Sequence, residues 1–252
     1  MTPTGRRAMF LAAASVVAGV LVWGLTGLPD FGDYHGPYGT ILDRVAVGER
    51  HGTNVVTAVV FDYRGVDTMI EEYILFASVI GVTLLLRRQR GERERPPSEV
   101  AKGRGEPEPS EAARVMGLGL VGPVILLGLY VVAHGALTPG GGFQGGVVLA
   151  TASGLVFLTG SFLSFERVNP IPLIDLAEGA GAAGYPALGL LGFGGGGAFL
   201  TNVLPLGRPG SLLSAGLIPL IDLAVGLAVA AGIVLILSEF LEQTLAIRGS
   251  RR

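Results

Sequence analysis

Apolar residues along this chain form long continuous runs rather than the short alternating segments of a soluble domain. Between Val115 and Phe165 there are 51 consecutive residues without Asp, Glu, Lys or Arg. A helix needs about 20 apolar residues to cross the hydrocarbon core of a bilayer, and several runs in this chain reach that length. The pattern predicts an all-α integral membrane protein.

Six runs are long enough to be transmembrane helices. They cover about 9–28, 68–86, 116–137, 146–164, 172–191 and 217–237. The first follows Arg6 and Arg7, as a secretory signal would, but it exceeds the about 7–15 apolar residues typical of a signal. We therefore expect this helix to be retained. The fifth run is the weakest, because glycines crowd its C-terminal end.

Basic residues are distributed unevenly around these runs. With six crossings both termini lie on one side, and that side collects fourteen of the eighteen cations. The opposite side keeps Arg44, Arg50 and Arg208, with Arg64 near its boundary. Cytoplasmic loops carry an excess of Lys and Arg, so both termini are predicted to be cytoplasmic.

A charged segment rich in proline, residues 87–111, interrupts the apolar pattern. It has too few large apolar residues to build a core. It predicts a cytoplasmic linker between a two-helix unit (1–86) and a four-helix unit (112–252). A patch that binds anionic lipid or nucleic acid is the other interpretation of such a run, and the interspersed glutamates oppose it.

The heptapeptide Ile-Pro-Leu-Ile-Asp-Leu-Ala occurs twice, at 171–177 and at 218–224. In the predicted topology the two copies open helices that run in opposite directions. Inverted repeats are typical of transporters. Two helix starts that use proline at the first position and an acid in the first turn explain the repeat more simply.

Composition narrows the class of protein further. Glycine accounts for 41 of 252 residues, more than twice the usual share of ~7%, which favours close helix packing in lipid. Cysteine is absent, which excludes disulfides, thiol catalysis and cysteine–zinc sites. No nucleophile–base pair, phosphate loop or cluster of metal ligands stands out in the sequence, so we do not expect an independent enzyme.

Ionisable residues within membrane helices are costly and usually mark a function. Asp222 is the clearest case, because it lies about five residues inside the sixth run, deeper than a helix cap. The other candidates lie near the ends of the predicted helices. They are Glu71, Glu72, His134, Asp175, Glu178, Glu239 and Glu242.

Structural roles remain open for most of these candidates. Thr68 and Glu71 have the spacing of a capping box. Asp175 and Glu178 suit the positive N-terminal end of their helix, and the glutamates after the sixth run suit a solvated helix end. These alternatives leave Asp222 as the strongest candidate for an ion-handling group.

The stretch between the third and fourth runs is unusually rich in glycine. Five glycines and a proline within 138–146 oppose an ordinary helix. Such backbone is tolerated at membrane depth only where it is buried in protein or lines a cavity. The residues of this glycine motif are Pro139, Gly140, Gly141, Gly142, Phe143, Gly145 and Gly146.

Two stretches resemble known families. His134 with LTPGGGFQGG (137–146) and SAGLIPLID (214–222) resembles the B subunit of Mrp (Mnh) multisubunit sodium/proton antiporters, over about 112–252. NVVTAVVFDYRGVDT (54–68) followed by Glu71 resembles MbhE, a module found at the C-terminal end of the large antiporter A subunit and as a small component of membrane-bound hydrogenases. These modules are commonly separate, so their fusion departs from the family pattern.

The resemblance implies a membrane subunit of a hetero-oligomeric sodium/proton antiporter related to complex I, in the cell membrane of a prokaryote. It implies subunits of the A, C, D, E, F and G types and membrane lipid as partners, and no nucleic acid. It implies no resident cofactor, since sodium and protons would be the transported ions. By residue match, Pro139, Phe143 and Asp222 would be functional, as would the pair Asp67 and Glu71.

Two alternatives remain open at this point. The same modules serve in membrane-bound hydrogenases and related redox complexes, in which other subunits transfer electrons. A scaffold subunit without an ion path is the second alternative. The sequence does not distinguish an antiporter from a redox complex, because both use these modules for coupled ion movement.

Overall fold

The computed structural model describes residues 3–28, 36–86, 109–160 and 162–250. Every regular element within these ranges is helical, which confirms the predicted all-α class. The elements are α1 (Pro3–Thr26), α2 (Pro37–Arg50), α3 (Val55–Ala58), the π-helix η1 (Val59–Tyr63), α4 (Gly65–Leu86), α5 (Glu111–Ala133), α6 (Gly142–Thr159), α7 (Phe162–Val168), α8 (Ile171–Gly194) and α9 (Ile218–Ser250).

Each of the six predicted apolar runs contains one long helix. Within the described residues, α1, α4, α5, α6 and α9 are long and apolar enough to cross a membrane. The 24-residue α8 is long enough but less apolar, because glycine and alanine dominate 179–184. A sixth crossing therefore remains a prediction, as does the cytoplasmic position of both termini.

Most of the predicted linker falls outside the described residues. Its last positions are described, and there Ser110 caps α5 by accepting a hydrogen bond from the Ala113 amide at 3.2 Å. Such a cap satisfies one of the free amide groups that begin every helix. The first helix after the predicted linker therefore begins at Glu111.

The chain divides into two compact units, residues 1–41 and 42–252. In the first unit, α1 has none of its apolar window buried, and its Trp23 is 78% exposed. The length and hydropathy of Arg7–Thr26 suit a helix that crosses a bilayer.

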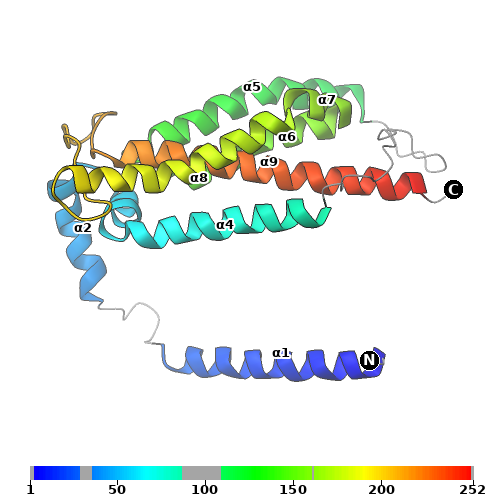
Figure 1. The fold of residues 1–252 in the computed structure, drawn as a ribbon, viewed down its shortest axis with the longest axis horizontal. Coiled ribbons are helices and arrows are strands. Elements are labelled where there is room, and N and C mark those ends of the chain that lie inside the picture. Colours follow the sequence, from blue (N-terminus) through cyan, green and yellow to red (C-terminus); the bar gives the residue numbers. More distant parts are fainter. Residues whose placement is uncertain (1–2, 29–35, 87–108, 161, 251–252) are drawn as a thin grey trace. The chain divides into compact units, whose positions relative to one another are not determined.

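The second unit is organised around α9, which packs against α4, α5, α6 and α8 (Figure 1). More than half of its apolar window, 56%, is buried, against 11% for α4 and 17% for α5. The core around its first half contains Tyr185, Leu217, Ile221 and Val225. Residues 42–86 thus pack with the four-helix unit instead of folding separately.

The two copies of the heptapeptide repeat begin α8 and α9. These helices run in opposite directions, because Gly181 of α8 packs beside Ala228 of α9 whereas Gly184 packs beside Ala224. The predicted antiparallel arrangement of the two copies is therefore confirmed. The repeats are not equivalent in burial, since Asp222 is fully buried whereas Asp175 is half-buried.

Glycine allows the helices to approach α9 closely. A β-carbon on Gly146 of α6 would lie 2.9 Å from the Gly226 carbonyl oxygen, and one on Gly181 of α8 would lie 2.5 Å from the Ala228 amide nitrogen. Real β-carbons do not approach backbone atoms this closely, so neither position accepts a side chain without moving a helix. The predicted use of glycine for close packing is borne out here.

The glycine motif departs from its predicted structure. We expected no helix across 138–146, yet α6 begins at Gly142 and includes Gly145 and Gly146. The three glycines pack against neighbouring helices at distances that only a residue without a side chain allows. Tertiary packing therefore outweighs the low helix propensity of glycine.

Substitution of Gly181 should be far more damaging than substitution of its neighbour Gly179, which has no atom within 4 Å of its β-carbon position. We expect Gly181→Ala to destabilise the protein by roughly 1–3 kcal/mol, because α8 must move away from α9. Gly179→Ala should be neutral or stabilising by up to about 1 kcal/mol. Thermal denaturation of the detergent-purified protein measures both, and equal melting temperatures would contradict this packing.

Candidate functional site

The glycine motif forms a tight turn between α5 and α6. Gly140 and Gly141 have φ angles of +134° and +137°, a region that residues with side chains rarely adopt. The turn leads directly into Gly142, the first residue of α6. Its conformation therefore depends on glycine at two consecutive positions.

The carboxyl group of Asp222 is enclosed by this turn. Asp222 is 0% exposed, and its Oδ1 accepts a hydrogen bond of 2.7 Å from the backbone amide of Gly142. A β-carbon on Gly141 would lie 2.7 Å from Oδ1, and one on Gly135 would overlap Oδ2. An acid from α9 thus caps the positive N-terminal end of α6.

Within the described part of the chain, the second carboxyl oxygen of Asp222, Oδ2, lacks such a hydrogen bond. Oδ2 is buried, and it has no hydrogen-bond partner among the residues that the structure describes. Burial without a partner is unfavourable for a polar atom. This oxygen is therefore the atom at which a proton or a cation would be stabilising.

The carbonyl groups of the same turn accept hydrogen bonds from side chains that precede α4. The side-chain amide of Asn54 donates to the carbonyl oxygens of Gly135 at 2.8 Å and Thr138 at 2.9 Å. The hydroxyl of Thr57, which is buried, also donates to Gly135 at 2.8 Å. The start of α3 thus fixes the turn that encloses Asp222.

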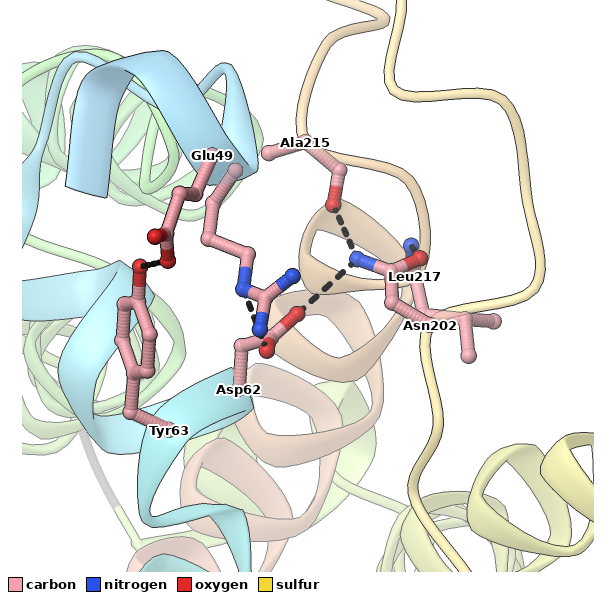
Figure 2. A network of polar contacts seen from close by, with 7 residues as sticks. Glu49, Asp62, Tyr63, Asn202, Ala215 and Leu217 are labelled. Carbon is pink, nitrogen blue, oxygen red and sulfur yellow. Dashed lines mark hydrogen bonds and ion pairs between the residues drawn. The ribbon is translucent and has the colours of Figure 1, made fainter. Parts of the chain in front are cut away.

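A second polar network fixes the start of α9 (Figure 2). Asp62 of η1 forms an ion pair with Arg50 of α2, with 2.8 Å between Nε and Oδ1. It also accepts a hydrogen bond of 3.1 Å from the side-chain amide of Asn202. Asn202 in turn donates to the Ala215 carbonyl at 3.0 Å and accepts from the Leu217 amide at 2.9 Å. The network ties η1 to the first turn of α9, just before Asp222.

Tyr63 completes this network on the side of α2. Its phenol donates a hydrogen bond of 2.5 Å to Glu49, and the Arg50 guanidinium lies 4.8 Å from the centre of its ring. Burial raises the pKa of Tyr63 to about 12. The phenol therefore stays protonated at neutral pH and remains a hydrogen-bond donor.

A cavity of about 580 Å³ opens beside the network. Its wall combines charged, polar and apolar side chains from η1, the start of α4 and the loop after α8. On its rim the Nε of Arg64 donates to Asp67 at 2.6 Å. The lining residues are Arg50, Asp62, Tyr63, Arg64, Gly65, Val66, Asp67, Phe199, Leu200 and Thr201.

Three further acids are buried, one each on α4, α8 and α9. Glu72 of α4 is 1% exposed, Glu178 of α8 is 7% exposed and Glu239 of α9 is 4% exposed. Neither oxygen of Glu72 has a hydrogen-bond partner within the described ranges. Together with Asp222, these residues place four carboxyl groups in the interior of the bundle.

The sequence offered both Glu71 and Glu72 as candidates, and the family resemblance favoured Glu71. In the structure Glu71 is exposed and Glu72 is buried. The spacing of Thr68, Glu72 and Val79, which are buried together on α4, is the signal that identifies the inner face. The predicted capping box is absent, because α4 begins at Gly65 and the Thr68 hydroxyl donates to the Val60 carbonyl at 2.6 Å.

The other predicted site residues lie outside the enclosed carboxyl groups. His134 is half-buried, with its ring stacked on Tyr130 at 4.1 Å between centres. Pro139 is exposed, and Phe143 packs against the core beside α9. Asp67 is also exposed. The structure thus brings the glycine motif to Asp222, but it does not bring His134, Asp67 and Glu71 into one cluster with that acid.

Two family models match separate parts of the chain. Residues 112–235 match the domain related to the MnhB subunit of Na+/H+ antiporters, and residues 36–101 match MbhE, the E-type subunit of MBH. An uncharacterized protein of Methanocaldococcus jannaschii is 31% identical over an alignment of 201 residues that covers 71% of this chain and 74% of the relative. The chain belongs to the MnhB-related family of membrane proteins, with an MbhE domain ahead of the MnhB-related domain.

Two solved structures share the fold. A chain of the membrane-bound sulfane sulfur reductase (MBS), an archaeal respiratory membrane complex, has a TM-score of 0.71 and 31% identity, and the match covers 94% of this chain and 98% of that one. A chain of the Mrp complex from Dietzia sp. DQ12-45-1b has a TM-score of 0.68 and 26% identity, over 95% of this chain but 26% of that longer chain. The fusion of the two modules is therefore shared with the reductase chain.

Substitutions at Gly141 test the turn around Asp222. Gly141→Ala should destabilise the protein by about 1–3 kcal/mol, because its φ angle suits only glycine and the new methyl group would meet the Asp222 carboxylate. Gly141→Leu should be more severe and should abolish assembly. Thermal denaturation and native gels report both effects. Gly119→Ala, at a glycine with open space around it, is the control, and normal stability of both Gly141 variants would refute the close approach.

Proposed function

We propose that this chain is a membrane subunit of an Mrp-type assembly related to complex I that exchanges sodium for protons. The observation that carries this proposal is the environment of Asp222. It is a fully buried acid on a membrane-spanning helix, and one of its two carboxyl oxygens is held by the Gly142 amide. The other oxygen has no partner among the described residues.

Such a carboxyl group has the chemistry that exchange requires. A proton and a monovalent cation compete for the same oxygen, so binding of one releases the other. The Gly142 amide keeps the group in place in both states, because a hydrogen bond to Oδ1 leaves Oδ2 available. Further oxygen ligands for sodium would come from water or from a neighbouring protein chain, as hard cations require several oxygens.

The proposed partners are supported by the relatives of the chain. Both solved relatives are chains of membrane complexes, and α1 is long and apolar enough to cross a membrane. We therefore propose a multi-pass component of the cell membrane that assembles with subunits of the A, C, D, E, F and G types. In such an assembly this chain transports ions and carries out no catalysis of its own.

A second candidate is a component of a redox-driven membrane complex. The match over 98% of a chain of the sulfane sulfur reductase favours it, since the match to the Mrp complex covers only 26% of a longer chain. Purification in mild detergent followed by identification of the bound chains separates the two. Antiporter-like chains alone support the first candidate, and additional iron–sulfur or other redox subunits support the second.

Asp222→Asn tests the ion-handling role directly. Asparagine keeps the size of the side chain, and its Oδ1 still accepts the hydrogen bond from Gly142, but it neither binds a proton nor carries a charge. We expect an assembled complex in which sodium/proton exchange is reduced at least about tenfold. Exchange is measured in membrane vesicles with a pH-sensitive dye after addition of sodium.

The control is Asp43→Asn, the same chemical change at an exposed position on α2, which should leave exchange unchanged. Normal exchange in Asp222→Asn would show that this carboxyl group only caps α6. Loss of assembly in Asp222→Asn would also assign it a purely structural role.

A further inference from the structure

We propose that protons move lengthwise through this chain along α9, through the buried carboxyl groups of Glu72, Glu178 and Glu239, to and from Asp222. This inference rests on the proposed exchange at Asp222 and adds the route by which protons reach that group. The four residues come from α4, α8 and α9, and each of these helices contacts the other two.

The position of Gly232 on α9 shows where the three helices meet. A β-carbon on Gly232 would lie 3.0 Å from Cγ2 of Val79 on α4 and 3.6 Å from Oε1 of Glu178 on α8. The carboxyl group of Glu178 therefore points at α9 at the level of Gly232, and Val79 of α4 reaches the same level.

The other acids lie at regular intervals from this level. Helices rise by about 1.5 Å per residue, and seven residues make about two turns, so such residues share a face about 10 Å apart. Glu239 follows Gly232 by seven residues, and Glu72 precedes Val79 by seven. Because α4 and α9 run in the same direction (Figure 1), the two glutamates lie on opposite sides of Glu178. Together with Asp222, the three glutamates form a column of carboxyl groups along α9. This column extends over roughly 25 Å of the ~30 Å hydrocarbon core.

Tyr185 of α8 lies near the end of α9 that carries Asp222. It is 0% exposed and belongs to the same core cluster as Ile221 and Val225 of α9. The phenol donates a hydrogen bond of 2.8 Å to the carbonyl of Gly65, and Gly65 also lines the 580 Å³ cavity. At the end that carries Asp222, the hydrogen bond from Tyr185 to Gly65 therefore links the surroundings of the column to the wall of an open polar cavity.

The spacing of the acids favours protons over metal cations as the ions that move along the column. A sodium ion needs several oxygen ligands around it, and the described part of the chain has no group of three or more His, Cys, Asp or Glu residues that could hold a metal ion. A single carboxyl group is enough to accept and release one proton. Glu72 is suited to this, since both of its buried oxygens lack partners within the described ranges.

Each step transfers one proton from a carboxylic acid to the next carboxylate, so that the donor becomes charged and the acceptor neutral. One proton enters at one end for each proton that leaves at the other, and the net charge of the column does not change over a cycle. The intervals of about 10 Å are longer than a hydrogen bond, so rotation of the side chains or one or two water molecules must bridge them.

The test uses Glu72→Gln and Glu178→Gln in the assembled complex. Glutamine preserves the size of each side chain but cannot transfer a proton. We expect both variants to assemble and to show sodium-driven proton movement in membrane vesicles at least about tenfold slower. Glu166→Gln, at an exposed glutamate of α7, is the matched control and should transport normally. Glu72→Asp retains a carboxyl group and should recover part of the rate.

Normal proton movement in both glutamine variants would overturn the proposed route. If Asp222→Asn were inactive in the same assay, exchange at Asp222 would stand and the protons would take another path. Failure of both glutamine variants to assemble would assign the carboxyl groups to packing and would also overturn the route. An aspartate at position 72 that is as slow as glutamine would count against proton transfer at this residue.

Discussion

The structure depends on how the backbone groups of one glycine-rich turn are satisfied inside an apolar bundle. A turn leaves amide and carbonyl groups without helical partners, and apolar surroundings offer no water to replace them. Asp222 accepts from the amide of Gly142, and Asn54 and Thr57 donate to the carbonyls of Gly135 and Thr138. The candidate ion site is thus also the place where the polar backbone groups of the turn find their hydrogen-bond partners.

The same contacts join the two family modules. Asn54 and Asp62 lie in the region that matches MbhE, whereas the turn and Asn202 lie in the MnhB-related region. Their side chains form hydrogen bonds from one region to the other at both ends of the Asp222 environment. The MbhE region therefore supplies part of the MnhB-related site. A substitution in one region is expected to alter the structure of the site in the other.

The sequence was sufficient for the six long helices and for the buried position of Asp222, because apolar length and an acid deep in an apolar run are local signals. It did not predict α2, α3 and η1, which lie between the first two apolar runs. It was not sufficient for the choice between Glu71 and Glu72, which depends on the face that α4 turns toward α9. It also failed for Gly142 to Gly146, since their helix is stabilised by contacts with other helices instead of by local propensity. Gly142, whose amide holds Asp222, lies 80 positions away along the chain, and no local pattern announces this pairing.

The contacts between the modules suggest a role for the linker that connects them. Hydrogen bonds of Asn54, Thr57 and Asp62 and the packing of α4 against α9 join the two modules. Covalent connection makes the encounter of the two modules intramolecular, which raises their effective concentration without any new contact. The interface between the modules can then include polar contacts that shape the site besides the apolar packing of α4 against α9. Selection on the tether would act on its length more than on the order of its residues.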